Sequence, residues 1–238
     1  MSLKAIIKKA KFQPNFVGFF INHNYLIRVG IQKAIKKNSH KLSGILLDFG
    51  CGSKPYNNYF LHVENYIGID LKIEGRTENH IYIDKFYDGK TIPFDDNYFD
   101  SLLCTEVLEH VFNIDELLKE MQRVLKPGAK AIITTPFMWE EHEMPYDFAR
   151  YTTLALINLY SKYGFQIISN FKTGNYVTVL FQFLLNYIKN ILPKNKILRQ
   201  ILLLPFISII NFLGTFFSFI LPVDKTAYFS NIFILQKI

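Results

Sequence analysis

Cysteine is scarce in this chain of 238 residues, in which only Cys51 and Cys104 occur. Two cysteines do not suggest the disulfide framework of a small secreted domain, so a reducing, cytosolic environment is the simpler expectation. Cys51 lies between two glycines with no evident base nearby, which favours a small residue in a tight turn over a nucleophile. Internal repeats and low-complexity linkers are also missing, so we expect no independent second domain.

Acidic residues are missing from the two flanks of the chain. Residues 1–47 hold nine Lys or Arg and no acid, a net charge of +9. Residues 48–147 hold nine basic residues against nineteen acids, a net charge of −10, and residues 148–238 hold nine against one, a net charge of +8. Basic flanks around an acidic centre predict docking on a negatively charged partner, either membrane phospholipid or nucleic acid.

Long apolar runs decide between these partners. Residues 201–221 carry no charge and are long enough to cross a bilayer, and residues 176–192 form a second apolar stretch. Nucleic-acid surfaces rarely need so much aliphatic material, and no RNA-binding signature is present, so nucleic acid is disfavoured. An anionic membrane surface is the expected partner.

The centre of the chain contains a glycine turn flanked by acids. Residues 46–53 read Leu-Leu-Asp-Phe-Gly-Cys-Gly-Ser, and residues 66–70 read Tyr-Ile-Gly-Ile-Asp. An apolar run that ends in closely spaced glycines predicts a buried parallel strand followed by a turn that a ligand can approach closely. Asp48 and Asp70 are near the spacing of roughly 20 residues found in nucleotide-binding βαβ units.

The third small residue of a dinucleotide fingerprint is missing, because Pro55 stands at that position. NAD is therefore disfavoured. An acid before a Gly-x-Gly turn resembles motif I of the class I S-adenosylmethionine-dependent methyltransferases. Residues 92–110 further resemble the "LPF..D..FD......LEH" segment of the small-molecule methyltransferases related to the ubiquinone and menaquinone biosynthetic enzymes.

The downstream pattern extends this resemblance over about residues 42–171. It predicts a helix over residues 114–125, a Lys-Pro-Gly stop and a strand over 129–135, with later strands over 164–168 and 231–237. The resemblance implies an α/β Rossmann-like class I methyltransferase fold, a seven-stranded, mostly parallel sheet flanked by helices. A hydrophobic helical insertion, about residues 174–228, is expected between strands six and seven. The predicted division is a basic helical extension, residues 1–41, and a methyltransferase domain, residues 42–238.

The resemblance implies S-adenosyl-L-methionine as cofactor. Asp70 matches the acid that accepts hydrogen bonds from the ribose hydroxyls, because a carboxylate provides two acceptor oxygens. Asp84, predicted to end a strand over residues 81–83, matches the acid near the adenine, with Asp88 as a competitor. The complete set of expected cofactor-binding residues is Asp48, Gly50, Cys51, Gly52, Asp70, Asp84, Thr105 and Glu106.

The acceptor is expected in a loop of aromatic, acidic and basic residues, 136–151, which follows the fifth strand. His142 is the predicted general base, since a neutral imidazole accepts a proton at cytosolic pH, with Glu143 orienting it. Transfer that depends on alignment alone is the alternative. No second histidine stands at zinc-motif spacing, so no metal is expected. The expected substrate-binding residues are Trp139, Tyr146, Arg150 and Tyr151.

The run from His142 to Thr152 resembles methyltransferases associated with bacterial polysaccharide biosynthesis. That resemblance implies O-methylation of a sugar hydroxyl on a glycan or lipid-linked glycan. An isoprenoid quinone C- or O-methyltransferase is the first alternative, and a non-catalytic membrane scaffold is the second. The acceptor is thus a small molecule or a lipid-linked one.

The apolar insertion also constrains the mode of membrane contact. Its two ends must return to the same side, and a hairpin of two crossings would carry Lys194, Lys196 and Arg199 across, against the positive-inside tendency. We therefore expect a cytoplasmic protein, peripheral or monotopic on the inner face of the cell membrane. A homodimer interface or a lid is the alternative. Residues 2–12 predict a basic amphipathic helix without a signal peptide's apolar core.

Overall fold

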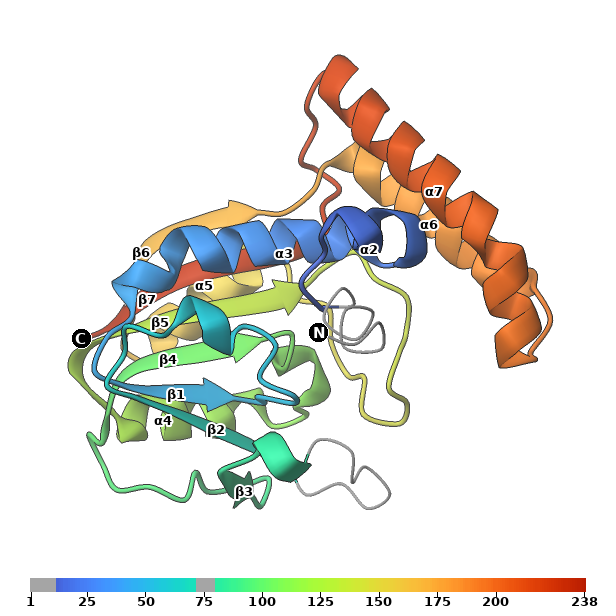
Figure 1. Ribbon diagram of the computed structural model, residues 1–238. Coiled ribbons are helices and arrows are strands. Elements are labelled where there is room, and N and C mark those ends of the chain that lie inside the picture. The colour runs from blue at the N-terminus through green and yellow to red at the C-terminus, as the bar shows by residue number, and fades with distance from the viewer. Residues whose placement is uncertain (1–11, 72–79) are drawn as a thin grey trace. The chain divides into compact units, whose positions relative to one another are not determined.

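The computed structural model describes residues 12–71 and 80–238, so most of the helix predicted over residues 2–12 lies outside the described residues (Figure 1). The elements are α2 (Phe16–Ile21), α3 (Tyr25–Asn38), η1 (Ser39–Lys41), β1 (Ile45–Phe49), η2 (Asn57–Tyr59), β2 (Asn65–Leu71), η3 (His80–Tyr82), β3 (Lys85–Tyr87), β4 (Phe99–Thr105), η4 (Leu108–His110), α4 (Ile114–Val124), β5 (Leu125–Pro136), α5 (Thr153–Lys162), β6 (Phe165–Lys172), α6 (Tyr176–Ile191), α7 (Lys196–Ile220) and β7 (Ser230–Lys237).

The chain comprises two compact units. One, the sheet unit, contains residues 35–171 and 231–238. The other, the helical unit, contains residues 172–230 together with the chain before residue 35. The division predicted at residues 41 and 42 stays a prediction.

The sheet has seven strands in the order β3-β2-β1-β4-β5-β7-β6. The pairs from β3 to β5 are parallel. The last strand runs the other way, since the Thr173 amide at the end of β6 donates to the Ser230 carbonyl (3.0 Å), and the Ile238 amide donates to the carbonyl of Gly164 before β6 (3.0 Å). This arrangement confirms the predicted seven-stranded, mostly parallel sheet, and α6 and α7 confirm the apolar helical insertion between β6 and β7.

One face of the sheet packs against α4 and α5. The apolar positions Leu117, Leu118 and Met121 recur on one side of α4 and are buried against alternate residues of the strands. Tyr160 of α5 is fully buried in the same cluster, where its ring meets that of Phe233 edge-on at 5.1 Å. Residues 101–104 of β4 are all fully buried, which is expected of a central parallel strand that is covered on both faces.

A partly exposed ion pair aligns the amino ends of the central strands. Asp100 accepts a hydrogen bond from the Ile45 amide (2.9 Å) and pairs with Lys126 Nζ (2.6 Å). Gly44 is in the left-handed region (φ +64°), and a Cβ there would lie 2.5 Å from Asp100 Oδ2. Asp100 therefore anchors the entrance of β4.

Two local predictions were wrong. Residues 81–83 form no strand: η3 covers residues 80–82, and β3 starts at Lys85, after Asp84. The apolar alternation at 81–83 is short, and Ile81 is 82 % exposed, so burial does not hold it in the sheet. The Lys-Pro-Gly segment, residues 126–128, does not stop α4 as a loop but lies within β5, where Gly128 (φ +80°) accommodates a register shift against β4.

The helical unit has its own small core. Leu185 of α6 packs with Leu203, Ile207 and Ile210 of α7. The amide of Asn211, which is fully buried, donates to the carbonyl of Phe19 in α2 (2.8 Å) and thereby fixes α2 against α7. Long apolar side chains on the other faces of these helices remain exposed; they include Phe16, Leu180, Tyr187, Ile191, Ile201, Ile209, Phe212 and Phe219.

Candidate functional site

The glycine turn follows β1 at the carboxyl edge of the sheet and is bound to the end of β2. The amides of Gly50 and Cys51 both donate to the Ile69 carbonyl, at 2.9 and 3.0 Å. The Gly52 amide donates to Asp70 Oδ2 (2.8 Å). Hydrogen bonds thus join the glycine turn to Asp70, because β1 and β2 are parallel neighbours whose carboxyl ends lie side by side.

The glycines of this turn serve different purposes. Gly50 (φ +69°) is required by packing, since a Cβ there would lie 2.4 Å from Val107 Cγ2. Gly52 (φ +50°) has no heavy atom within 4 Å of the same position, so its surface faces open space. A Cβ on Gly68 would lie 2.7 Å from Cys51 Sγ, so close packing of the turn on β2 needs this glycine also. Gly52 is therefore the place where a ligand can contact the backbone directly.

Asp48 lies beneath the turn with its side chain buried. Burial raises its pKa to about 7, although the hydrogen bond from Tyr66 and the charge of Lys54 oppose the rise. The Tyr66 hydroxyl donates to Asp48 Oδ2 at 2.5 Å. Asp48 therefore supports the turn from below rather than presenting a free carboxylate at its surface.

Asp84 immediately precedes β3 and is tied to the same turn. Its Oδ2 accepts a hydrogen bond from the Gly68 amide (2.7 Å) and forms an ion pair with Lys54. About half of the side chain is exposed (49 %), so part of the carboxylate stays accessible. Its predicted contact with adenine stays a prediction, as does that of Asp88, which follows the end of β3.

At the end of β4 the backbone turns sharply. Glu106, next to Thr105, has a left-handed conformation (φ 54°), which is uncommon for a residue with a side chain. Its amide donates to the Thr134 carbonyl (3.0 Å), and the Thr134 hydroxyl donates to Glu106 Oε1 (2.6 Å). Strain of this kind is typical of functional sites.

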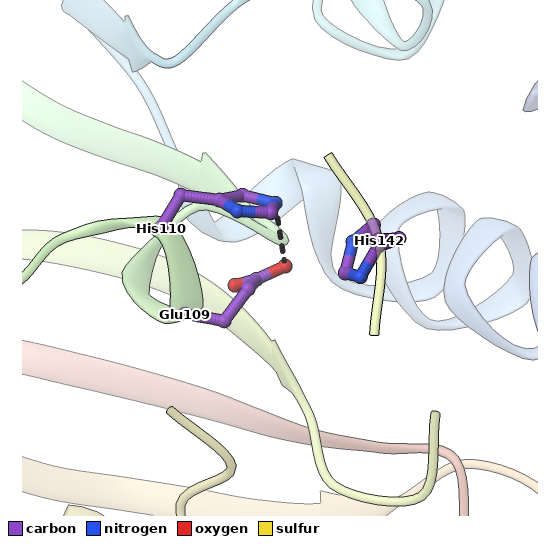
Figure 2. A group of neighbouring side chains, drawn as sticks. All are labelled: Glu109, His110 and His142. Atoms are coloured by element: carbon purple, nitrogen blue, oxygen red, sulfur yellow. Dashed lines mark ion pairs between the residues drawn. The ribbon is translucent and has the colours of Figure 1, made fainter. Parts of the chain in front are cut away.

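Glu109 is a residue that sequence reasoning did not select. Its side chain is fully buried, and neither carboxylate oxygen has a hydrogen-bond partner. Burial, followed by the charge of Glu106, raises its pKa well above the ordinary value. The nearest cation-forming group is His110, whose Nε2 lies 3.6 Å from Glu109 Oε1 (Figure 2). A buried carboxyl group without partners is costly, so its presence calls for a ligand or a proton.

The loop after β5 is organised by an ion pair. Arg150 donates to both carboxylate oxygens of Asp147, at 2.6 and 2.7 Å, and to the Glu140 carbonyl at 3.1 Å. Although burial acts to raise it, hydrogen bonds from Arg150 and the His142 amide lower the pKa of Asp147 to about 2. Arg150 thus holds the loop together, and its predicted contact with a substrate stays a prediction.

His142 is held by Asp147. Its Nδ1 lies 3.2 Å from Asp147 Oδ2, and burial lowers its pKa below the ordinary value. The Arg150 guanidinium lies 3.4 Å from the same nitrogen. In the tautomer that carries its proton on Nδ1, Asp147 accepts that proton's hydrogen bond and the Nε2 lone pair is available. Asp147 is therefore placed to orient the imidazole, and the orienting role of the exposed Glu143 stays a prediction. General-base catalysis by His142 stays a prediction.

The remaining predicted acceptor residues have different surroundings. Tyr146 is exposed (52 %), and its carbonyl accepts a hydrogen bond from His110 Nδ1 (2.6 Å). Trp139 is half-buried in the same loop. Tyr151 packs against the hydrophobic core beside α5, so its ring supports the fold. Their contacts with a substrate stay predictions.

The two loops bring Glu109, His110 and His142 together (Figure 2). One potential ligand atom from each lies within 4.8 Å of the others, and the two imidazole rings meet edge to face at 4.8 Å. The cluster unites residues 32 positions apart in the chain, so no local spacing signals it.

A sheet of this order, with a glycine turn after β1 and an acid at the end of β2, defines a class I methyltransferase fold. Residues 47–133 match the family model described as "Methyltransferase domain". The chain thus has the class I methyltransferase fold, and its segment 47–133 is similar to the methyltransferase domain.

Solved structures agree on the fold. An S-adenosylmethionine-dependent methyltransferase from Mesorhizobium loti superposes with a TM-score of 0.54 at 13% identity, covering 89% of this chain and 100% of that one. The [4+2]-cyclase SpnF superposes with a TM-score of 0.55 at 17% identity, covering 87% of this chain and 82% of that one. One neighbour is thus called a cyclase, so the fold by itself does not define the reaction.

Curated relatives match shorter regions. An uncharacterized protein of Methanocaldococcus jannaschii is 32% identical over 130 residues, 50% of this chain and 53% of that one. A ubiquinone/menaquinone biosynthesis C-methyltransferase of Chromobacterium violaceum is 37% identical over 71 residues, 29% of each chain. The chain thus spans about half of the first relative and less of the second.

Proposed function

We propose that this protein transfers a methyl group from S-adenosyl-L-methionine to an acceptor at the carboxyl edge of the sheet. The observation that carries the proposal is the turn at Gly52, which faces open space and is joined by its amide to the carboxylate of Asp70. An exposed glycine backbone beside an acid suits a ligand that combines an amino-acid part with ribose hydroxyls. The methyltransferase-domain match over residues 47–133 supports the same cofactor.

Each expected cofactor residue has a place in this proposal. Gly50, Cys51 and Gly52 would hold the methionine part, with Asp48 supporting them from below. Asp70 would bind the ribose. Asp84, just before β3, would lie near the adenine. Thr105 and Glu106, at the end of β4, would lie near the methionine end of the cofactor.

Isothermal titration calorimetry with S-adenosylmethionine tests the proposal. Binding by the wild-type protein and a marked loss in Asp70→Asn are expected, because the amide keeps the shape but loses one acceptor oxygen. A folded protein that does not bind would contradict the enzyme proposal and favour the alternative of a non-catalytic scaffold.

For the acceptor, we propose a sugar hydroxyl of a glycan or lipid-linked glycan. The support is the position of the loop with Trp139 and Tyr146 after β5, next to the polar Glu109, His110 and His142 cluster. An isoprenoid quinone is the second candidate, favoured by relatives named as ubiquinone/menaquinone methyltransferases. Mass spectrometry of glycans and quinones from a deletion strain separates the two, since only the true product loses its methyl group.

We also propose that the helical unit contacts the inner face of an anionic membrane. Helix α7 is 25 residues long with a mean hydropathy of 2.0, and 28% of its apolar window is buried. That length and composition suffice to cross a membrane, yet they also occur in soluble proteins. Helix α6 has 16 residues, about 24 Å, which is shorter than the hydrocarbon thickness of roughly 30 Å. A two-helix crossing is therefore disfavoured, and helices lying in the surface layer agree better with these lengths.

Co-sedimentation with phosphatidylglycerol vesicles tests membrane contact. Binding of the wild type and a strong decrease in Phe212→Glu are expected, because Phe212 is 56 % exposed on α7. Leu61→Glu is the matched control: Leu61 is 85 % exposed in the sheet unit, so its replacement should leave binding unchanged. A wild type that stays in the supernatant, or that sediments equally without vesicles because it self-associates, would contradict the proposal.

A further inference from the structure

The Glu109, His110 and His142 cluster combines the donor types of a transition-metal site. Two imidazoles and one carboxylate are a recurrent catalytic zinc set, which keeps one coordination position open. Imidazole favours zinc, copper, iron and nickel over magnesium and calcium. No other group of three or more such residues close enough for a metal was found within residues 12–71 and 80–238.

Each ring has one nitrogen fixed and the other available. The Tyr146 carbonyl can only accept, so His110 Nδ1 carries the proton and Nε2 keeps its lone pair. His142 Nδ1 lies 3.2 Å from the Asp147 carboxylate and 3.4 Å from the Arg150 guanidinium. His142 would bind a metal through Nε2 in the tautomer that carries its proton on Nδ1, toward Asp147. A carbonyl or carboxylate behind each histidine is the usual outer shell of a metal site.

Glu109 supplies the second, independent observation. Its carboxyl group is fully buried and lacks a hydrogen-bond partner for both oxygens, while Figure 2 shows it pointing between the two rings. A bound cation would compensate the burial of this carboxyl group, to which no residue of the described chain donates a hydrogen bond. The backbone amide of Phe148 donates a hydrogen bond to the Glu109 carbonyl (2.8 Å), which joins the backbone of Glu109 to the loop that carries His142.

We propose that Glu109, His110 and His142 form a binding site for one divalent transition-metal ion, with Zn²⁺ as the best match. Zinc–ligand bonds of about 2.1 Å place tetrahedral ligands roughly 3.4 Å apart, so a cluster that spans 4.8 Å must contract by about 1.4 Å. Rotation of His142, whose side chain is 29% exposed on a loop, provides that movement. In this site His142 is a ligand, which replaces its predicted role as general base.

The metal site would also take part in the proposed methyl transfer, and its role in that reaction rests on the proposed function. The ion would take the acceptor hydroxyl as its further ligand and lower the pKa of that hydroxyl. The proton then leaves to solvent, the oxygen forms a bond to the methyl carbon, and the carbon–sulfur bond breaks with its electron pair on sulfur. The products are a methyl ether and a neutral thioether.

Metal binding is tested with Zn²⁺ alone on the full-length, tag-free protein, by competition with a chromophoric chelator. We expect one ion per chain, and a loss of affinity of more than about 100-fold in both Glu109→Gln and His142→Ala, since outer-shell changes already cost roughly 10–100-fold. His40→Ala is the matched control. His40 is exposed in η1, just before β1 at the opposite edge of the sheet, so its removal should change nothing.

Thermal unfolding separates a metal ligand from a merely structural residue. Zn²⁺ should raise the unfolding midpoint of the wild type and of His40→Ala, but not that of His142→Ala. Absence of one-to-one binding by the wild type, or wild-type affinity in both ligand variants, would overturn the site. A protein that binds S-adenosylmethionine but no Zn²⁺ would overturn the metal site alone, whereas one that binds Zn²⁺ but no S-adenosylmethionine would contradict the proposed function.

Discussion

Replacement of Gly52 by alanine separates the stability of the glycine turn from its use. The residue has φ +50°, and an added methyl group meets no heavy atom within 4 Å. The left-handed backbone costs about 1–2 kcal/mol with a side chain. For a chain of this size, that cost corresponds to a fall in the unfolding midpoint of roughly 2–8 °C. Gly52→Ala should therefore fold.

The same methyl group should interfere strongly with cofactor binding. It occupies the open space in which the proposed S-adenosylmethionine contacts the backbone, so we expect its affinity to fall more than about tenfold, or roughly 1.4 kcal/mol. Calorimetry measures the affinity, and circular dichroism measures the midpoint.

Two control variants separate an effect on stability from an effect on cofactor affinity. Gly128→Ala introduces the same left-handed strain (φ +80°) in β5, with its nearest contact at 3.8 Å, so it should lower stability but not affinity. Gly50→Ala adds a clash at 2.4 Å with Val107 Cγ2, and overpacking of this kind costs a further 1–3 kcal/mol or so. It should be the least stable of the three. A Gly52→Ala protein that binds S-adenosylmethionine as tightly as Gly128→Ala would refute the reasoning.

Two further variants, with one control, test the electrostatics of the site. The pKa of Asp48 is raised from 3.8 to about 7 in the folded state, so the folded protein loses stability as pH rises between these values. Asn cannot ionise, and the unfolding free energy of Asp48→Asn should therefore exceed that of the wild type by a few kcal/mol at pH 8 but not at pH 4. Urea titrations at the two pH values measure this difference. A pH-independent difference would contradict this. Arg150→Ala removes the guanidinium that pairs with the buried carboxylate of Asp147 and should cost about 3 kcal/mol, with faster proteolysis of the loop after β5. Lys162→Ala, which breaks an exposed pair, should leave the urea midpoint unchanged.

Periodicity and turn chemistry predicted the central fold because they are local signals. The apolar run before Asp48, the alternation on α4 and the pair of apolar segments in the insertion each appear within a short window of sequence. The strand over residues 81–83 was wrong for the same reason, since a brief alternation at an edge carries little information without knowledge of burial. Gly128 was interpreted as a stop, although a bulge in a strand also requires a left-handed residue.

The acceptor side could be predicted only in part. His142 stood out through its residue type, but its orientation by Asp147 depends on a loop closed by Arg150. Glu109 gave no signal, because its significance lies in being buried without a partner, and burial of an acid is not visible in sequence. The cluster with His110 depends on β4 and β5 being neighbours in the sheet, which only the topology shows.

Incubation of membranes with the purified protein and methyl-labelled S-adenosylmethionine tests the central claim most directly. Mass spectrometry of the extracted glycans and quinones should find the label in the lipid-linked glycan fraction with the wild type. The label should be absent with Asp70→Asn, whose acid belongs to the proposed cofactor site. Transfer of equal label by both proteins, or no labelled product with a wild type that binds the cofactor, would contradict the account.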